Sequence, residues 1–219
     1  MLERHLQFVR VERPDPAETA VAARVRLADK FPRTALRRMT HPGLLVGAAL
    51  DGLALLAGDA VVYATSHAET RALEDYLASF PAASPLLFQT SIHPSAVQQV
   101  MIGRQQPVRR FWPMTGRRRL VESALLTALV EPAPRVLVLG AEERGTWLLE
   151  QGMASDRAFA FALLLDRDPS GAGGRIGFEP GGGASDGPVP SLDDFAAALA
   201  ERRPLQWRGA GGDWTVRWS

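Results

Sequence analysis

Short apolar runs along the chain predict the strands of a buried sheet. Residues 60–65 (AVVYAT) and 135–140 (RVLVLG) are apolar almost throughout, which is typical of strands covered on both faces in a parallel or mixed sheet. Residues 5–12 alternate between apolar and polar side chains, which predicts a half-buried edge strand. Residues 159–166 and 175–179 are two further apolar runs, and they predict an antiparallel pair of strands.

Helices are predicted between these strands. Residues 44–56 are almost wholly apolar and predict a helix that is buried on most sides, with Pro42 at its start. Ser191, followed by two aspartates, predicts the N-terminal cap of a helix over residues 192–202. Further helices are predicted over residues 17–29, 67–80, 94–103 and 115–130, and short strands over residues 108–112 and 214–218. The alternation of strand and helix as far as Gly140 indicates an α/β fold, with a mixed central sheet and helices on its faces.

Composition narrows the classes of function. The chain has 219 residues, of which 46% are hydrophobic, and this predicts a single domain over residues 1–219 with a flexible glycine-rich loop at residues 170–190. The formal net charge of +1 gives no global argument for binding nucleic acids or membranes. The absence of cysteine excludes disulfides, thiolate metal sites and a cysteine nucleophile. No signal segment is visible, and the longest apolar stretch is too short to span a bilayer, so we expect a cytoplasmic protein.

One polar cluster follows the buried strand over residues 60–65. Ser66, His67 and Glu69 stand where a strand leads into a helix, which is where sites lie in open α/β sheets. The favoured interpretation is structural, with Ser66 and Glu69 forming a capping box. A Ser-His-acid triad is the weaker interpretation, because no G-x-S-x-G motif is present. The four histidines are scattered without metal-ligand spacing, so we expect no metal site and no cofactor.

A run of arginines forms a local basic patch in this neutral chain. Residues 76–120 contain no acidic residue. The arginines of the patch are Arg104, Arg109, Arg110, Arg117, Arg118 and Arg119. The last three open the helix predicted over residues 115–130, where positive charges oppose the helix dipole. An ordinary solvated face is the favoured interpretation, and the unfavourable placement supports docking of an acidic partner as the functional alternative. Nucleic acid is a poor further alternative, because few aromatic residues are interleaved.

Several motifs, taken in order, resemble one family. They are LRRMT before an apolar helix, VVYATSHAE from strand to helix, SPLLFQTSIHP, and the later runs RVLVLG and AFAFALLL. This order resembles the N-terminal half of β-ketoacyl synthases. It is more closely similar to the short ketosynthase-like proteins of aryl polyene pigment clusters, which are known as chain length factors. The resemblance covers residues 37–166 and implies a thiolase-like fold. The chain departs from the family pattern at Ala68, where glycine is usual, and at His93-Pro94.

The resemblance also bears on catalysis. In condensing enzymes the nucleophilic cysteine stands at the end of the strand that follows a Gly-Pro, and counting from Pro107 places that position at Thr115 and Gly116. Claisen condensation needs a thiolate to hold the acyl chain and imidazoles to assist, and the family's catalytic histidines belong to a C-terminal half. The resemblance therefore implies a non-catalytic subunit that pairs with a catalytic β-ketoacyl synthase in polyene or fatty-acid-like synthesis. The implied dimer interface contains Val108, Phe111, Trp112 and Leu120.

Two alternatives stay open. The first is a homodimeric binding or scaffold protein that docks an acidic acyl carrier protein through the arginine patch. The second is a divergent enzyme that uses the polar cluster of Ser66, His67 and Glu69, with His93 as a further candidate.

Overall fold

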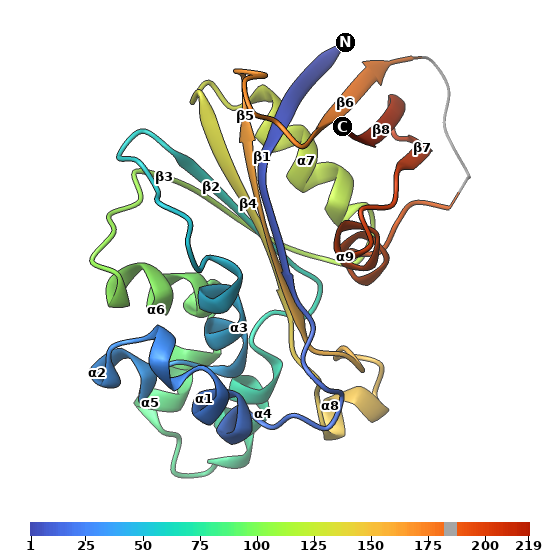
Figure 1. The fold of residues 1–219 in the computed structure, drawn as a ribbon. Helices are drawn as coiled ribbons and strands as arrows, with labels where there is room; N and C mark the ends of the chain where they lie inside the picture. Colours follow the sequence, from blue (N-terminus) through green and yellow to red (C-terminus); the bar gives the residue numbers. More distant parts are fainter. Residues whose placement is uncertain (182–187) are drawn as a thin grey trace.

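One mixed sheet organises the molecule. The computed structural model describes residues 1–181 and 188–219. In this part of the chain the strands follow the order β3-β2-β4-β5-β1-β6-β8-β7 across the sheet (Figure 1). Their bounds are β1 Leu2–Glu12, β2 Ala60–Thr65, β3 Arg110–Thr115, β4 Arg135–Glu142, β5 Phe159–Asp166, β6 Gly174–Pro180, β7 Leu205–Gly209 and β8 Gly212–Trp218. The predicted mixed sheet of an α/β fold is confirmed.

Parallel pairing is confined to one end of the sheet. Strand β2 pairs in parallel with both β3 and β4, and the remaining strand pairs are antiparallel. Two predictions were wrong here. Strand β1 is not an edge strand, because it lies between β5 and β6. Strands β5 and β6 do not pair, because each is antiparallel to β1 instead.

Helices cover both faces of the sheet, and the pleat explains why. Along β2, Ala60, Val62 and Ala64 join a core with helices α7 and α9, whereas Val61 and Tyr63 join a second core with α3 and α6. In Figure 1, α7 and α9 lie on one side of the sheet, and α3 and α6 lie on the other. The helices run over α1 Ala20–Arg26, α2 Arg33–Leu36, α3 His41–Ala49, α4 Thr70–Ala78, α5 Pro85–Ser91, α6 Ser95–Gly103, α7 Leu120–Val130, α8 Trp147–Glu150 and α9 Leu192–Ala200, with a short 3-10 turn at Ala28–Lys30.

Several helices begin or end away from their predicted bounds. Every residue of α3 is buried, as predicted, but the helix ends at Ala49, just before Asp51-Gly52. Helix α7 begins at Leu120 and not at Thr115, because Arg119 adopts a left-handed backbone conformation with φ of 56°. Residues 117–119 therefore precede the helix and do not form its first turn. The short elements α5, α8 and β7 were not predicted.

Two further sequence predictions concern the glycine-rich loop and membrane spans. Within the predicted loop at residues 170–190, residues 174–180 form strand β6, and residues 182–187 lie outside the described residues. Among the described helices, none is long and apolar enough to cross a membrane.

Candidate functional site at the carboxyl ends of the parallel strands

The three parallel strands end at the same edge, and the loops that follow carry the candidate residues. Strands β2 and β3 end at Thr65 and Thr115, which are opposite each other in register, and β4 ends nearby at Glu142. The Gly116 N–H donates a hydrogen bond of 3.2 Å to the Thr65 carbonyl, so the two loops remain joined beyond the sheet. This is the edge at which open α/β sheets place their sites.

The position implied for the lost nucleophile lies beside His67. The Arg117 guanidinium donates to the Gly152 carbonyl at 3.1 Å, which fixes the loop after Gly116 against the end of α8. Burial is the main cause that lowers the pKa of His67, and the positive charge of Arg117 lowers this pKa further. The structure thus brings Thr115, Gly116 and His67 to one place, although no side chain there carries a thiol.

Glu69 and His93 form a separate, deeper pair. The Glu69 carboxylate accepts a hydrogen bond of 2.9 Å from the Ala96 N–H at the start of α6, and its other oxygen lies 3.8 Å from His93 Nδ1. The His93 ring stacks on Tyr63 at a centroid distance of 5.1 Å. Burial raises the pKa of Glu69 to about 7 and lowers the pKa of His93 to about 4, so His93 is uncharged near neutrality and about half of the Glu69 groups are protonated.

The predicted capping box was wrong. Glu69 itself occupies the N-cap position of α4, where no side chain caps the helix, and its carboxylate serves α6 instead. The Ser66 N–H donates to Glu142, a residue of β4. Ala68 has a φ of 58°, in the left-handed region that favours glycine, which is the family's usual residue at this position.

The polar cluster is not arranged as a catalytic triad. Among the described residues, no hydrogen bond joins the side chains of Ser66, His67 and Glu69, because Glu69 points to Ala96 and His93. In the same described residues, no group of three His, Cys, Asp or Glu side chains is placed to hold a metal ion.

Three buried carboxyl groups were missed by sequence reasoning. Glu142 accepts from Ser66 N–H, Glu143 accepts from the Arg71 N–H at 2.9 Å, and Glu74 accepts from the Thr146 N–H at 2.7 Å. Burial raises the pKa of Glu142 to about 7 and that of Glu143 to about 8. Each carboxyl joins the segment that follows β2, including α4, to the end of β4 or the loop after it. The signal in the sequence was the pair of glutamates directly after the apolar run 135–140.

The arginine patch is divided by strand β3. Arg109 and Arg110 stand at the start of the strand and Arg117 to Arg119 follow its end, a separation of about 20 Å for a strand of this length. Arg104 is turned inward and donates to the Gly47 carbonyl at 3.3 Å, and burial lowers its pKa. These six arginines do not form one continuous patch.

Strand β3 forms one edge of the described sheet, and its side chains are held by a single glutamate. Glu131, just after α7, accepts from Arg110 at 3.0 Å and from the Trp112 indole N–H at 2.9 Å. Trp112 is 46% exposed, and Val130 at the end of α7 is 57% exposed. Leu120, in contrast, is buried in the chain's own core, and Phe111 is half-buried against the second core.

Comparison with solved structures places this arrangement among known folds. A chain in the structure of the ketosynthase ApeO in complex with its chain length factor ApeC, from Xenorhabdus doucetiae, matches with a TM-score of 0.65 at 19% identity. The match covers 99% of this chain and 100% of that chain. The chain has a ketosynthase-like fold. The structure of the ishigamide ketosynthase/chain length factor matches this ketosynthase-like chain with a TM-score of 0.59 at 14% identity, over 82% of this chain and 68% of that one.

The family resemblance inferred from the sequence motifs is confirmed at the level of the fold. No family model matches the sequence of this ketosynthase-like chain, and no curated protein matches it. Thr115 and Gly116, the position that the motif resemblance implies for the nucleophile, stand at the end of β3, before the start of α7. A fold does not by itself determine a function, which depends on the residues of the site.

Proposed function

We propose that the chain is a non-catalytic, chain-length-factor-type subunit that pairs with a catalytic β-ketoacyl synthase in polyene or fatty-acid-like biosynthesis. The observation that carries this proposal is a ketosynthase-like fold in a chain without cysteine. The match over the full length of a chain from a ketosynthase–chain length factor complex supports the same role.

The chemistry of the lost nucleophile position supports a non-catalytic role. Condensation requires a thioester on the enzyme, and a hydroxyl such as that of Thr115 forms an ester only with an activating base beside it. His67 follows the end of β2, to which the Gly116 N–H is bonded at Thr65, but no hydrogen bond joins His67 to Thr115 in the described structure. Arg117 occupies the following loop and is held by the Gly152 carbonyl. The residues at this position therefore maintain the loop and do not activate an acyl group.

The pairing surface that we propose is the free edge of β3 with the exposed end of α7. Leu126 and Val130 are four residues apart on α7 and thus on one face, at 38% and 57% exposure. Glu131 binds the Trp112 indole, which sets the exposed Trp112 ring beside that face. An edge strand with open backbone groups next to exposed apolar side chains is a surface suited to strand pairing with a partner. Leu120 is excluded from this surface by its burial.

Co-expression with a catalytic β-ketoacyl synthase of the same organism tests the proposal. We expect a 1:1 complex on size-exclusion chromatography with mass measurement, and we expect Trp112→Arg to weaken it at least tenfold. An arginine at this position can still donate to Glu131, so the variant should fold, while its charge disrupts the apolar contact. Trp147→Arg is the matched control, because Trp147 is exposed to a similar extent, 44%, on a different part of the surface.

Three outcomes would count against this role. The first is the absence of any complex, and the second is equal loss of complex in both tryptophan variants. The third is a parent chain that elutes alone as a dimer and binds a carrier protein with an affinity that falls as salt is raised. If changing Arg109 and Arg118 to glutamate abolishes that binding, the scaffold alternative is favoured.

A further inference from the structure

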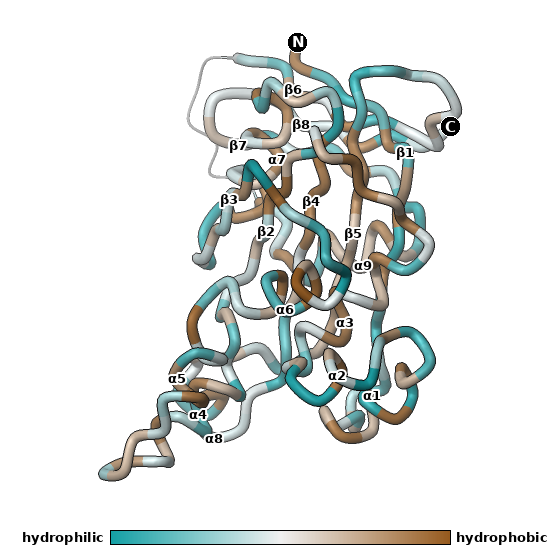
Figure 2. Tube along the Cα trace, turned by 90° about the vertical axis from the view of Figure 1, so that its left-hand side faces the viewer, coloured by the Kyte–Doolittle hydropathy of each residue, from teal (hydrophilic) through white to brown (hydrophobic). Residues whose placement is uncertain are grey.

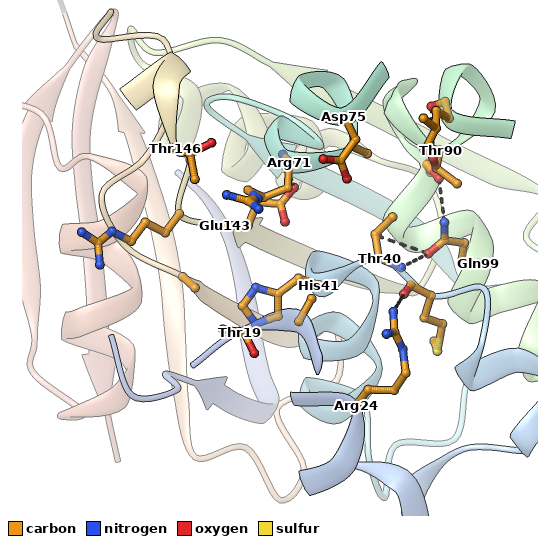
Figure 3. Close-up of a pocket in the computed structure, with 18 of the residues that line it drawn as sticks. Thr19, Arg24, Thr40, His41, Arg71, Asp75, Thr90, Gln99, Glu143 and Thr146 are labelled. Atoms are coloured by element: carbon orange, nitrogen blue, oxygen red, sulfur yellow. Dashed lines mark hydrogen bonds between the residues drawn. The ribbon is translucent and has the colours of Figure 1, made fainter. Parts of the chain in front are cut away.

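A large cavity of the described structure lies apart from the β3 edge. Its volume is about 1430 Å³, and it is lined by residues of helices α1, α3, α4, α5, α6 and α8 and by the loop that follows α2. Figure 3 shows this cavity, with His41, Arg71 and Glu143 close together on its wall. No step of the pairing proposal uses it, so it requires its own explanation.

Exposed apolar side chains gather at this cavity. Leu86, Ile102 and Trp147 all line it, and they are 68%, 77% and 44% exposed. Large apolar side chains that remain in water around one concave surface are typical of a binding site for an apolar molecule. Leu87 and Leu149 extend the same lining.

The charged part of the lining has an excess of free positive charge. Arg37 and Arg38 are exposed on the rim, and among the described residues their guanidinium groups have no hydrogen bond or ion pair. Arg71 has one side-chain contact, an ion pair of 3.6 Å with Glu74. Free arginines beside an apolar wall bind carboxylate or phosphate groups through paired N–H donors.

The acidic groups of the lining do not cancel this charge. Glu18 is paired with Arg26 at 2.6 Å. Glu143 is buried, with the Arg71 N–H on one oxygen, and burial raises its pKa to about 8, so it is mainly protonated at neutral pH. Asp75 and Glu150 are the other acidic residues of the lining. They are offset by Arg24 and Arg144, which also line the cavity and donate to backbone carbonyls, so an excess of positive charge remains. The cavity thus presents unpaired arginine side chains next to exposed apolar side chains.

We propose that this cavity binds an amphipathic molecule with an anionic head, a carboxylate or phosphate monoester, and an apolar body. The head lies against Arg37, Arg38 and Arg71, and the body lies against Leu86, Ile102 and Trp147. The ligand binds to the chain alone, so this inference stands or falls independently of the pairing with a synthase.

Isothermal titration calorimetry of the isolated chain with four probes tests the inference. Octanoate and octyl phosphate carry an anionic head on the same tail, octylammonium carries the opposite charge, and acetate carries the head alone. We expect the two anionic amphiphiles to bind, with affinity falling as salt is raised, and we expect octylammonium and acetate to bind at least about tenfold more weakly. Whichever anionic probe binds more tightly identifies the preferred head.

Matched variants assign the contacts. The double variant Arg37→Gln/Arg38→Gln should weaken octanoate binding at least about tenfold. Arg33→Gln should leave the binding unchanged, because Arg33 is exposed on α2, just before Arg37 in the chain, but does not line the cavity. Leu86→Ser should weaken the binding, whereas Leu56→Ser, at a residue that is 58% exposed outside the cavity, should not.

Several results would overturn the inference. They are no binding of either anionic amphiphile, equal binding of octylammonium, or an equal effect of Arg33→Gln and the double variant.

Discussion

Glu143 illustrates how single carboxyl groups hold the candidate site together. Its side chain is almost fully buried, and one oxygen accepts from the Arg71 N–H while the other has no hydrogen-bond partner among the described residues. The nearby carboxyls of Glu69 and Glu142 share this environment, and burial raises the pKa of each to about 7. A protonated carboxyl suits such a site, because it keeps one acceptor without a buried charge.

Stability should therefore fall as pH rises. The raised pKa of Glu143 means that the folded chain holds a proton that the unfolded chain releases above pH of about 4.5. The free energy of unfolding should then decrease between about pH 5 and pH 8 and level off above. Glu143→Gln mimics the protonated group. The free energy of unfolding of this variant, minus that of the parent, should therefore increase as the pH rises from about 5 to about 8. Urea denaturation at pH 5 and pH 8.5 measures this difference.

Glu179→Gln provides the control for this prediction, because Glu179 is exposed on β6. The difference in free energy of unfolding between Glu179→Gln and the parent should be the same at pH 5 and at pH 8.5. A Glu143→Gln variant with the same pH dependence as the parent would show that Glu143 is ionised in the folded chain at pH 5.

At the scale of elements, Glu131 connects the end of α7 to the edge strand β3. Its carboxylate accepts from Arg110, Trp112 and the Ala133 N–H. Burial alone would raise the pKa of Glu131, but the hydrogen bonds from Ala133, Trp112 and Arg110 outweigh it and lower the pKa below its ordinary value. The side chain is therefore a charged acceptor for three donors on two elements.

Removing that charge should loosen β3. Glu131→Gln should lower the free energy of unfolding by about 1–3 kcal/mol, because it replaces charge-assisted hydrogen bonds and leaves a donor without an acceptor. Acrylamide quenching of tryptophan fluorescence should increase as Trp112 loses its partner, and urea denaturation gives the free energy. Unchanged stability together with unchanged quenching would mean that β3 is held by its pairing with β2 alone.

The sequence was informative where the pattern was local. Strands β2 and β5 were predicted to the residue, and the Ser191 capping box of α9 is present. The order of strands was not predictable in this way, because nothing in residues 2–12 indicates that β1 inserts between β5 and β6. The start of α7 depends on the left-handed Arg119, a residue type for which that conformation is unusual.

The candidate site shows the same division between local and distant effects. Ser66 and His67 were recognisable because they follow a buried strand directly. The partners of Glu69 lie on α6, and Glu142 reaches Ser66 from a strand more than seventy residues later. Such pairings depend on the packing of the whole sheet, and no short motif encodes them. The absence of cysteine was the clearest indication of function in the sequence, but it could be interpreted only together with the ketosynthase-like fold.

At the scale of the whole molecule, the two cores share their strands. Alternate residues of β2, β4 and β5 point into one core or the other, so neither core can form without the same central strands. Figure 2 shows brown, hydrophobic segments along the middle of β4 and β5, with teal segments mainly in the outer loops. The described structure should therefore unfold as one cooperative unit.

Two buried glycines, one for each core, test this cooperativity. A Cβ on Gly140 in β4 would lie 2.3 Å from the Phe161 ring, and a Cβ on Gly47 in α3 would lie 2.3 Å from the Phe31 ring. Each substitution by alanine should reduce the free energy of unfolding by about 1–3 kcal/mol through overpacking. Gly58→Ala is the control, because a Cβ there meets no atom within 4 Å.

Tryptophan fluorescence and far-UV circular dichroism, recorded in the same urea titrations, distinguish one unit from two. Trp207 and Trp214 belong to the core of α7 and α9, whereas Gly47 lies in the other core. In a single unit Gly47→Ala shifts both signals to the same lower urea midpoint, because loss of its core removes the strands on which the tryptophans pack. A shift in circular dichroism with an unmoved fluorescence midpoint would instead mean that the two faces unfold separately.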